Sequence, residues 1–173
     1  MLRALALAAG LLAAVPAAAQ TAPQYPVKIP APGGEAIIPN AMYQREYDEV
    51  GYAAARRVGD TLYVSGGIVA RRKDEGNDEA AFKAQTLRTY KQLEATLKAA
   101  GASWDDVVMV NSFHVWDSPN FTGKPMDQIR VMTEVRRSLS SAPAPAWTAV
   151  GTTGLLAPTG IVEVQVIAHM PKK

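Results

Sequence analysis

The final apolar run of the chain carries a polar side chain at every second position. Between Ile161 and Ala168, valines alternate with Glu163 and Gln165. Because successive side chains of a strand point to opposite faces, this run predicts a strand with one apolar and one polar face. An amide can orient a water by hydrogen bonding, although it cannot accept a proton as a carboxylate can. We therefore look for a site on the polar face. The alternative is that Glu163 and Gln165 are simply solvated.

A second candidate feature ends an earlier predicted strand. The run Leu62–Ser65 is followed directly by Gly66 and Gly67. Paired glycines let a backbone approach a ligand closely, but they are at least as typical of a β-bulge. Ser65 and Gly66 are therefore candidates for a binding site, with a purely structural role as the alternative.

Other chemistry is largely excluded by composition. The chain has no cysteine, so disulfides, thiolate catalysis and cysteine-type zinc sites are ruled out. Its two histidines, His114 and His169, are far apart in the sequence, which favours structural roles over a metal site. The 18 basic and 16 acidic residues are nearly balanced and form no basic cluster, so we expect no nucleic-acid partner. No cofactor is expected.

The elements that must position these residues follow a recognisable order. A hairpin is predicted from Tyr52–Val58 and Thr61–Gly66, because Gly59-Asp60 suits a tight turn. Next come a long helix that begins at Asn77 and ends at Gly101, a strand over Val107–Trp116, and a helix that begins at Pro125. Two strands follow, over Trp147–Gly151 and Ile161–Ala168. The pattern predicts an α+β fold with two helices on one face of a single sheet. Subunit association would cover the other face.

The residues before this domain have two different compositions. Arg3, an apolar run and then Ala17-Ala18-Ala19 predict a signal peptide over residues 1–19, with cleavage after Ala19 and a periplasmic or secreted product. After cleavage we expect no membrane attachment. Residues 20–49 are rich in proline, which predicts an extended arm rather than core, although Ile37-Ile38 could add an edge strand. The main domain is expected over residues 50–171.

Four ordered motifs resemble those of one known family. They lie at Val58–Ile68, Leu93–Val108, Pro145–Gly151 and Val162–Ala168. They are similar to the strand "v-G-d-x-x-y-x-S-G-q-i", the helix-to-strand "l-x-x-A-G-a-s-x-d-d-V-v", and the closing "P-A-R-x-x-v-x" and "v-E-i-E-x-i-A" of the RidA/YjgF family, also called endoribonuclease L-PSP. The resemblance covers about residues 50–170.

This resemblance implies a chorismate-mutase-like fold, with a mostly antiparallel sheet, assembled as a homotrimer with a ligand cleft at each subunit interface. RidA-type members hydrolyse reactive 2-imino acids without a cofactor. An arginine of the family binds the substrate carboxylate, and a glutamate of the last strand positions the water. In this chain the resemblance implies a cleft formed by Tyr52, Ser65, Gly66, Arg130, Trp147, Ala149, Glu163 and Gln165.

Two departures from the family pattern bear on the chemistry. Trp147 occupies the arginine position, and Gln165 occupies the glutamate position. An indole offers one uncharged donor where a guanidinium gives two charged hydrogen bonds, so an anionic substrate should bind poorly. Trp147 could instead form part of an apolar pocket or fill the space of a lost site, and Arg130 could supply a displaced charge or lie on a solvated helix face.

Three functions remain open at this stage. The first is an exported trimer that binds a small metabolite without hydrolysing 2-imino acids. The second is an imine or enamine deaminase in which Gln165, Ser65 and a water do the work. The third is a ribonuclease, which rests on the family label alone; the balanced charge and the expected export argue against it.

Overall fold

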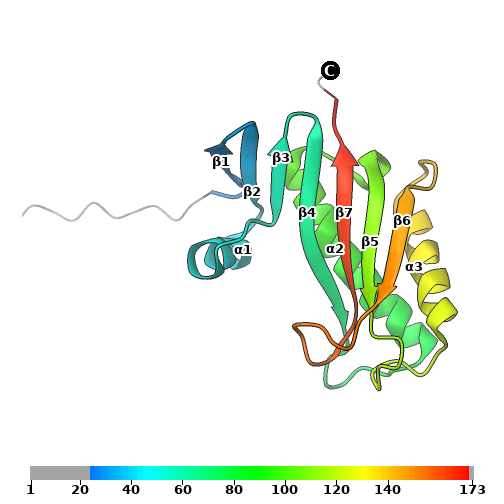
Figure 1. The fold of residues 1–173 in the computed structure, drawn as a ribbon. Coiled ribbons are helices and arrows are strands. Elements are labelled where there is room, and N and C mark those ends of the chain that lie inside the picture. Colours follow the sequence, from blue (N-terminus) through cyan, green and yellow to red (C-terminus); the bar gives the residue numbers. More distant parts are fainter. Residues whose placement is uncertain (1–23, 172–173) are drawn as a thin grey trace, which may run out of the picture.

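A computed structural model describes residues 24–171 of the chain, so the predicted signal peptide lies outside the described residues. Seven strands form one sheet in the order β1-β2-β3-β4-β7-β5-β6. Every neighbouring pair is antiparallel except β5 and β6, which are parallel. The strands are β1 (Val27–Ala31), β2 (Gly34–Ile38), β3 (Ala55–Val58), β4 (Thr61–Ala70), β5 (Val107–His114), β6 (Ala146–Gly151) and β7 (Gly160–His169). The last strand, β7, therefore lies in the middle of the sheet (Figure 1).

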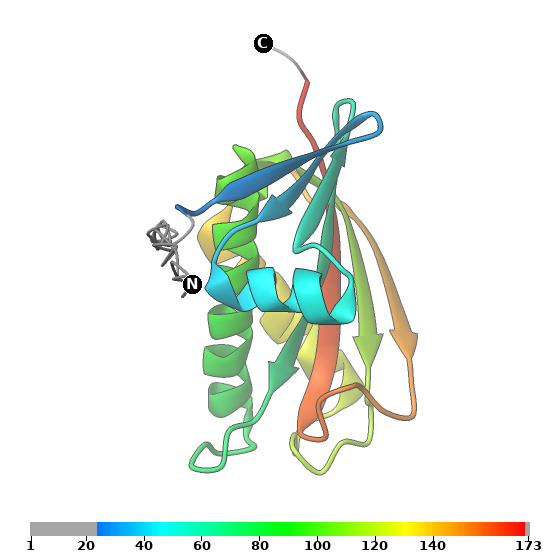
Figure 2. The ribbon, with the colours of Figure 1, turned by 90° about the vertical axis from the view of Figure 1, so that its left-hand side faces the viewer.

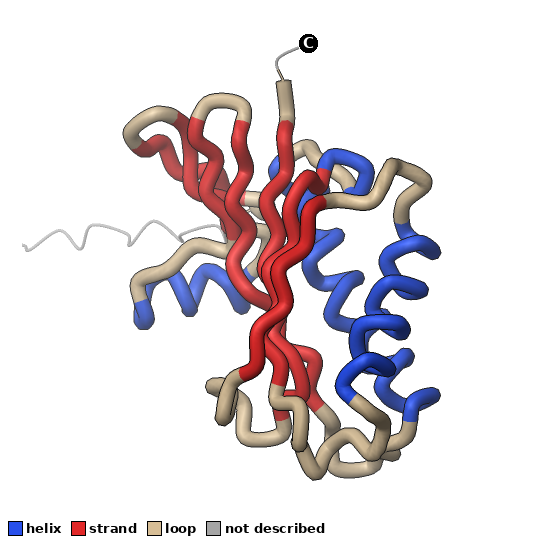
Figure 3. Tube along the Cα trace, turned by 45° about the vertical axis from the view of Figure 1, so that its right-hand side comes forward, coloured by secondary structure: helices blue, strands red, loops and turns tan. Residues whose placement is uncertain are grey.

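Two long helices cover one face of this sheet, as the sequence predicted. They are α2 (Glu79–Ala100) and α3 (Pro125–Leu139), and Figure 3 shows both on the same side of the strands. The α+β class is therefore confirmed. The core lies between these helices and the sheet and includes the valines of β7, whose exposed fraction is zero. The opposite face of the central strands has no helix packed over it (Figures 1 and 3).

The ends of α2 follow from local chemistry. Asp78 caps its N-terminus, because its carboxylate accepts a hydrogen bond from the N–H of Ala81. This is one residue later than predicted, since Asn77 instead donates from its side chain to the carbonyl of Pro119. Gly101 ends the helix at φ 88°, a left-handed conformation that glycine adopts without strain.

The N-terminal region differs from the predicted arm. Strands β1 and β2 form a hairpin, and β2 pairs with β3, so both strands extend the sheet. Ile37 and Ile38 are fully buried. Pro30 lies in the edge strand β1 and Pro32 lies in the hairpin turn, where a missing N–H is tolerated. Residues 20–23 of the predicted arm are not described.

A short helical segment connects this hairpin to the main sheet. It consists of α1 (Ala41–Arg45) and a π-helical turn, η1 (Glu46–Val50), and it ends at Gly51 with φ 90°. Figure 2 shows the segment crossing the edge of the sheet, from the side of α2 to the opposite face. The predicted extended arm included residues 41–49, so this helical segment corrects that prediction.

The two strands that close the chain are not direct neighbours. A turn region joins β6 and β7 in the sequence, but β5 lies between them in the sheet. Parallel pairing of β6 with β5 becomes possible because α3 carries the chain back along the sheet between the two strands. β6 is consequently an edge strand.

Candidate functional site

A pocket of about 360 Å³ opens on the sheet face that α2 and α3 leave uncovered. It is lined by Tyr52, Ser65, Gly66, Ile68, Leu156, Glu163 and Gln165. Five of these residues were predicted from the sequence. The pocket joins the polar face of β7 to the glycine-rich part of β4 and to the residue that follows η1. The polar side chains of β7 are therefore only partly exposed rather than freely solvated.

A β-bulge shapes the floor of this pocket. The register between β4 and β7 shifts between Val64 and Gly67, so Ser65 and Gly66 together stand opposite the single residue Gln165. The hydroxyl of Ser65 donates to the carbonyl of Ala53 at 2.7 Å. That bond fixes the bulge against the segment that leads into β3. The paired glycines thus form a bulge, and the bulge also forms part of a pocket.

Gly66 leaves room for the carboxylate of Glu163. A Cβ atom placed on Gly66 would lie 2.1 Å from Oε1 of Glu163. A larger residue at position 66 would therefore displace the Glu163 side chain. Sequence analysis placed Glu163 and Gln165 in one cleft, and both residues line this pocket. The bulged residues Ser65 and Gly66 line the same pocket as these two side chains.

Tyr52, which directly follows Gly51 at the end of η1, also lines the pocket. Partial burial raises the pKa of the Tyr52 phenol above its ordinary value, and the nearby Glu46 carboxylate raises it further, followed by that of Glu163. Tyr52 is thus a neutral hydrogen-bonding group at pH 7 that is subject to the negative charges of Glu46 and Glu163. Gln165 receives one long hydrogen bond, 3.4 Å from Nδ2 of Asn111 to its Oε1.

Trp147 lies on the other face of the sheet. Its indole Nε1 donates to Oγ of Ser112 at 2.8 Å, and Ser112 is a buried residue of β5. In the single chain the indole therefore does not line the pocket. Its ring is packed against the hydrophobic core.

The indole begins a chain of buried hydrogen bonds. Ser112 Oγ lies 2.8 Å from Nε2 of His114, and Nδ1 of His114 lies 2.7 Å from Oε1 of Gln128 on α3. Because the indole can only donate, Ser112 must give its own proton to His114, whose Nδ1–H then donates to Gln128. This series of hydrogen bonds therefore assigns His114 as the neutral Nδ1–H tautomer. Burial lowers the pKa of His114 from its ordinary value, which agrees with that assignment.

The two remaining predicted residues are also outside the pocket. Arg130 is exposed on α3, where it pairs with Glu79, Asp127 and Glu134. Its position corresponds to the solvated helix face that we considered as the alternative. Ala149 is exposed on β6 and lies in register with Ser112. Neither residue brings charge to the pocket within one chain.

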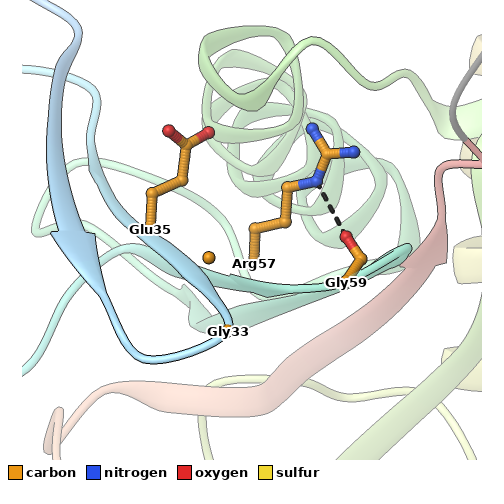
Figure 4. Close-up of a pocket in the computed structure, with 5 residues that line it drawn as sticks. Gly33, Glu35, Arg57 and Gly59 are labelled. Carbon is orange, nitrogen blue, oxygen red and sulfur yellow. Dashed lines mark hydrogen bonds between the residues drawn. The ribbon is translucent and has the colours of Figure 1, made fainter.

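A second depression, of about 440 Å³, lies between the β1–β2 and β3–β4 turns (Figure 4). Glu35 and Arg57 project into it from paired strands. Arg57 donates to the carbonyl of Gly59 at 3.1 Å, and Glu35 pairs with Lys28 at 3.3 Å. Because partners within the chain satisfy these charged groups, we regard the depression as a feature of the surface.

Sequence reasoning missed two apolar residues of the first pocket. Ile68 follows the bulge on β4, and Leu156 lies in the loop between β6 and β7. Leu156 is 95% exposed, which is unusual for a leucine. The only sequence signal for Leu156 is its position near Gly154 and Pro158 in a turn-rich segment.

Among residues 24–171, no group of three or more potential metal ligands comes together. No helix in this range has the length and apolar character that crossing a bilayer requires.

Comparisons with known proteins agree with the fold and the motifs. The family model described as endoribonuclease L-PSP matches residues 44–170. The RutC family protein YjgH of Escherichia coli is 39% identical over 129 residues, which are 73% of this chain and 88% of that protein. A solved structure of YjgH gives a TM-score of 0.55 at 36% identity, covering 73% of this chain and 89% of that one. The structure of RidA from an Antarctic Psychrobacter bacterium gives 0.54 at 29% identity, covering 69% and 88%. The chain therefore belongs to the endoribonuclease L-PSP family, which is the RidA/YjgF family.

Proposed function

We propose that this protein is an exported trimer that binds a small metabolite in the Tyr52–Gln165 pocket and does not hydrolyse 2-imino acids. The single observation that carries the proposal is the lining of the pocket, which includes a serine, a glutamate, a glutamine and a tyrosine but neither arginine nor lysine. Polar groups that converge in a partly apolar hollow are typical of ligand sites. The export rests on the composition of residues 1–19.

The trimer is supported by the uncovered face of the sheet. Tyr63, Phe113 and Val150 are each more than a third exposed, on β4, β5 and β6. Apolar side chains gathered on one face are typical of a surface that another subunit covers. In such an assembly the pocket would be completed at a subunit interface.

The experiment that tests the proposal is an imine hydrolysis assay. We would generate 2-aminoacrylate, and separately a bulkier 2-imino acid, and follow release of the 2-keto acid with the purified protein. We expect the uncatalysed rate, because nothing in the pocket offers a carboxylate the charged double hydrogen bond of an arginine. Clear acceleration that is lost in Ser65→Ala would overturn the proposal.

One observation favours a second candidate, an imine or enamine deaminase with altered substrates. The Glu163 carboxylate reaches the pocket over Gly66, so a group able to accept a proton is present beside Gln165. General-base catalysis typically contributes about 10²–10⁴-fold. If an uncharged imine is hydrolysed, Glu163→Gln should lower the rate by about that factor, whereas Glu35→Gln, which lies outside this pocket, should leave it unchanged.

A further inference from the structure

The inference concerns the charge of the ligand and rests on the proposed function of the pocket. Glu163 takes part in no ion pair among the described residues. Two arginines that could have neutralised Glu163 form ion pairs with other residues. Arg88 pairs with Glu75, and Arg130 pairs with three acidic residues of the helix layer. Glu163 is therefore a half-buried carboxylate whose counter-charge does not come from the residues around it.

The position of this carboxylate is fixed by the backbone. Glu163 projects from the central strand β7, and its Oε1 lies where a side chain at Gly66 would otherwise be. The bulge at Ser65 and Gly66 is in turn held by the hydrogen bond to Ala53. A charge on a central strand, above a glycine, is held more rigidly than one on a surface loop.

The remaining walls suit an apolar body next to a positive charge. Ile68 and Leu156 supply aliphatic surface, and Tyr52 supplies an aromatic ring. An aromatic face attracts a cation, and the field of Glu46 and Glu163 around Tyr52 adds to that attraction. An anion would meet the same field as repulsion.

We propose that the pocket selects small organic cations, in which a protonated nitrogen pairs with Glu163 while an apolar portion packs between Tyr52, Ile68 and Leu156. Gln165 accepts a further hydrogen bond from the same nitrogen. The preferred ligand is thus an amine, an amidine or an iminium compound without a carboxylate, the opposite charge class from an anionic 2-imino acid.

The test compares three probes that share one apolar body: benzylammonium, benzyl alcohol and benzoate. Binding to the purified protein is measured by calorimetry at pH 7 in low salt. We expect benzylammonium to bind at least about 10-fold more tightly than benzoate, with the alcohol between them. Raising the salt concentration should reduce this difference.

Variants separate the charge from the pocket. Glu163→Gln should lower benzylammonium binding to the level of benzyl alcohol and leave the alcohol unchanged. Glu35→Gln, which removes a partly buried carboxylate from the second depression, should change none of the three. If benzoate binds as tightly as benzylammonium, the charge inference fails while the pocket stands. If none of the three probes binds at millimolar concentration, the proposed function fails with it.

Discussion

The fold controls the protonation of the buried residue His114 through its hydrogen bonds. The chain Trp147–Ser112–His114–Gln128 gives His114 both hydrogen bonds in its neutral form, and the ring also stacks on Trp116 at a centroid distance of 4.0 Å. A proton added at Nε2 of His114 would clash with the hydroxyl hydrogen of Ser112, which already points at Nε2. The hydroxyl would have to turn, and the charge would remain buried.

This arrangement predicts a pH dependence of folding. The pKa of His114 is lowered in the folded protein, so the unfolded chain takes up the proton first as the pH falls below about 6.5. Stability is therefore complete above pH 6.5 and is lost as the pH falls toward the folded pKa. Urea unfolding at pH 7.5 and pH 5.5 should show this loss, and His114→Gln should flatten it. The exposed His169→Gln serves as the control and should keep the full loss. An equal loss of stability in His114→Gln would contradict the role given to His114.

At the residue scale, the sequence predicted most of the pocket residues but not the direction of every side chain. Ser65, Gly66, Glu163 and Gln165 were found through alternation and glycine pairing, which are local signals. The direction of Trp147 could not be predicted in this way. It depends on the register of β6 against β5, which sets Trp147 opposite the buried Val110 and hence on the core face.

At the scale of elements, the segment α1–η1 determines where Tyr52 lies. Tyr43 of α1 contacts the side of α2, and burial raises the pKa of its phenol, while Tyr52 borders the pocket on the other face. Gly51 joins the two at φ 90°, where no side chain of an L-residue fits without strain. The π-helical turn and this glycine together direct the chain around the edge of the sheet.

Gly51→Ala is therefore expected to cost about 1–2 kcal/mol of stability and to weaken probe binding in the pocket, because the strain moves Tyr52. Space is not the cause, since a Cβ at Gly51 would meet nothing within 4 Å. Gly154→Ala is the matched control, because it also has open space but no positive φ. Thermal unfolding and calorimetry on both variants check the prediction. Equal effects of the two substitutions would argue against it.

The elements that sequence analysis placed well are those with strong local signals. Helix α2 was predicted almost to its ends, because its capping residues lie next to it in the sequence. The β1–β2 hairpin was taken for an arm, because Pro30 and Pro32 suggested a linker while the burial of Ile37 and Ile38 depends on α2 and β3. That burial is a long-range packing effect that short patterns do not encode.

At the scale of the whole molecule, the uncovered sheet face is what the proposed trimer must explain. Val150 on edge strand β6 is 41% exposed on that face, and Leu87 on α2 is 40% exposed on the helix layer. Val150→Glu should dissociate the assembly into smaller species, because it would place an unpaired charge in the interface. Leu87→Glu should leave the assembly intact. Light scattering during gel filtration measures both, and a wild-type monomer would refute the trimer.

The central place of β7 also bears on how the protein is made. Strands β4 and β5 both pair with β7, which is the last of the seven to leave the ribosome. Until residues 160–169 have emerged, no strand joins the two halves of the sheet, and β4 and β5 each have an unpaired edge. The seven-stranded sheet can therefore close only after β7 has been made, so the pairing of β4 and β5 with β7 is a late step of folding.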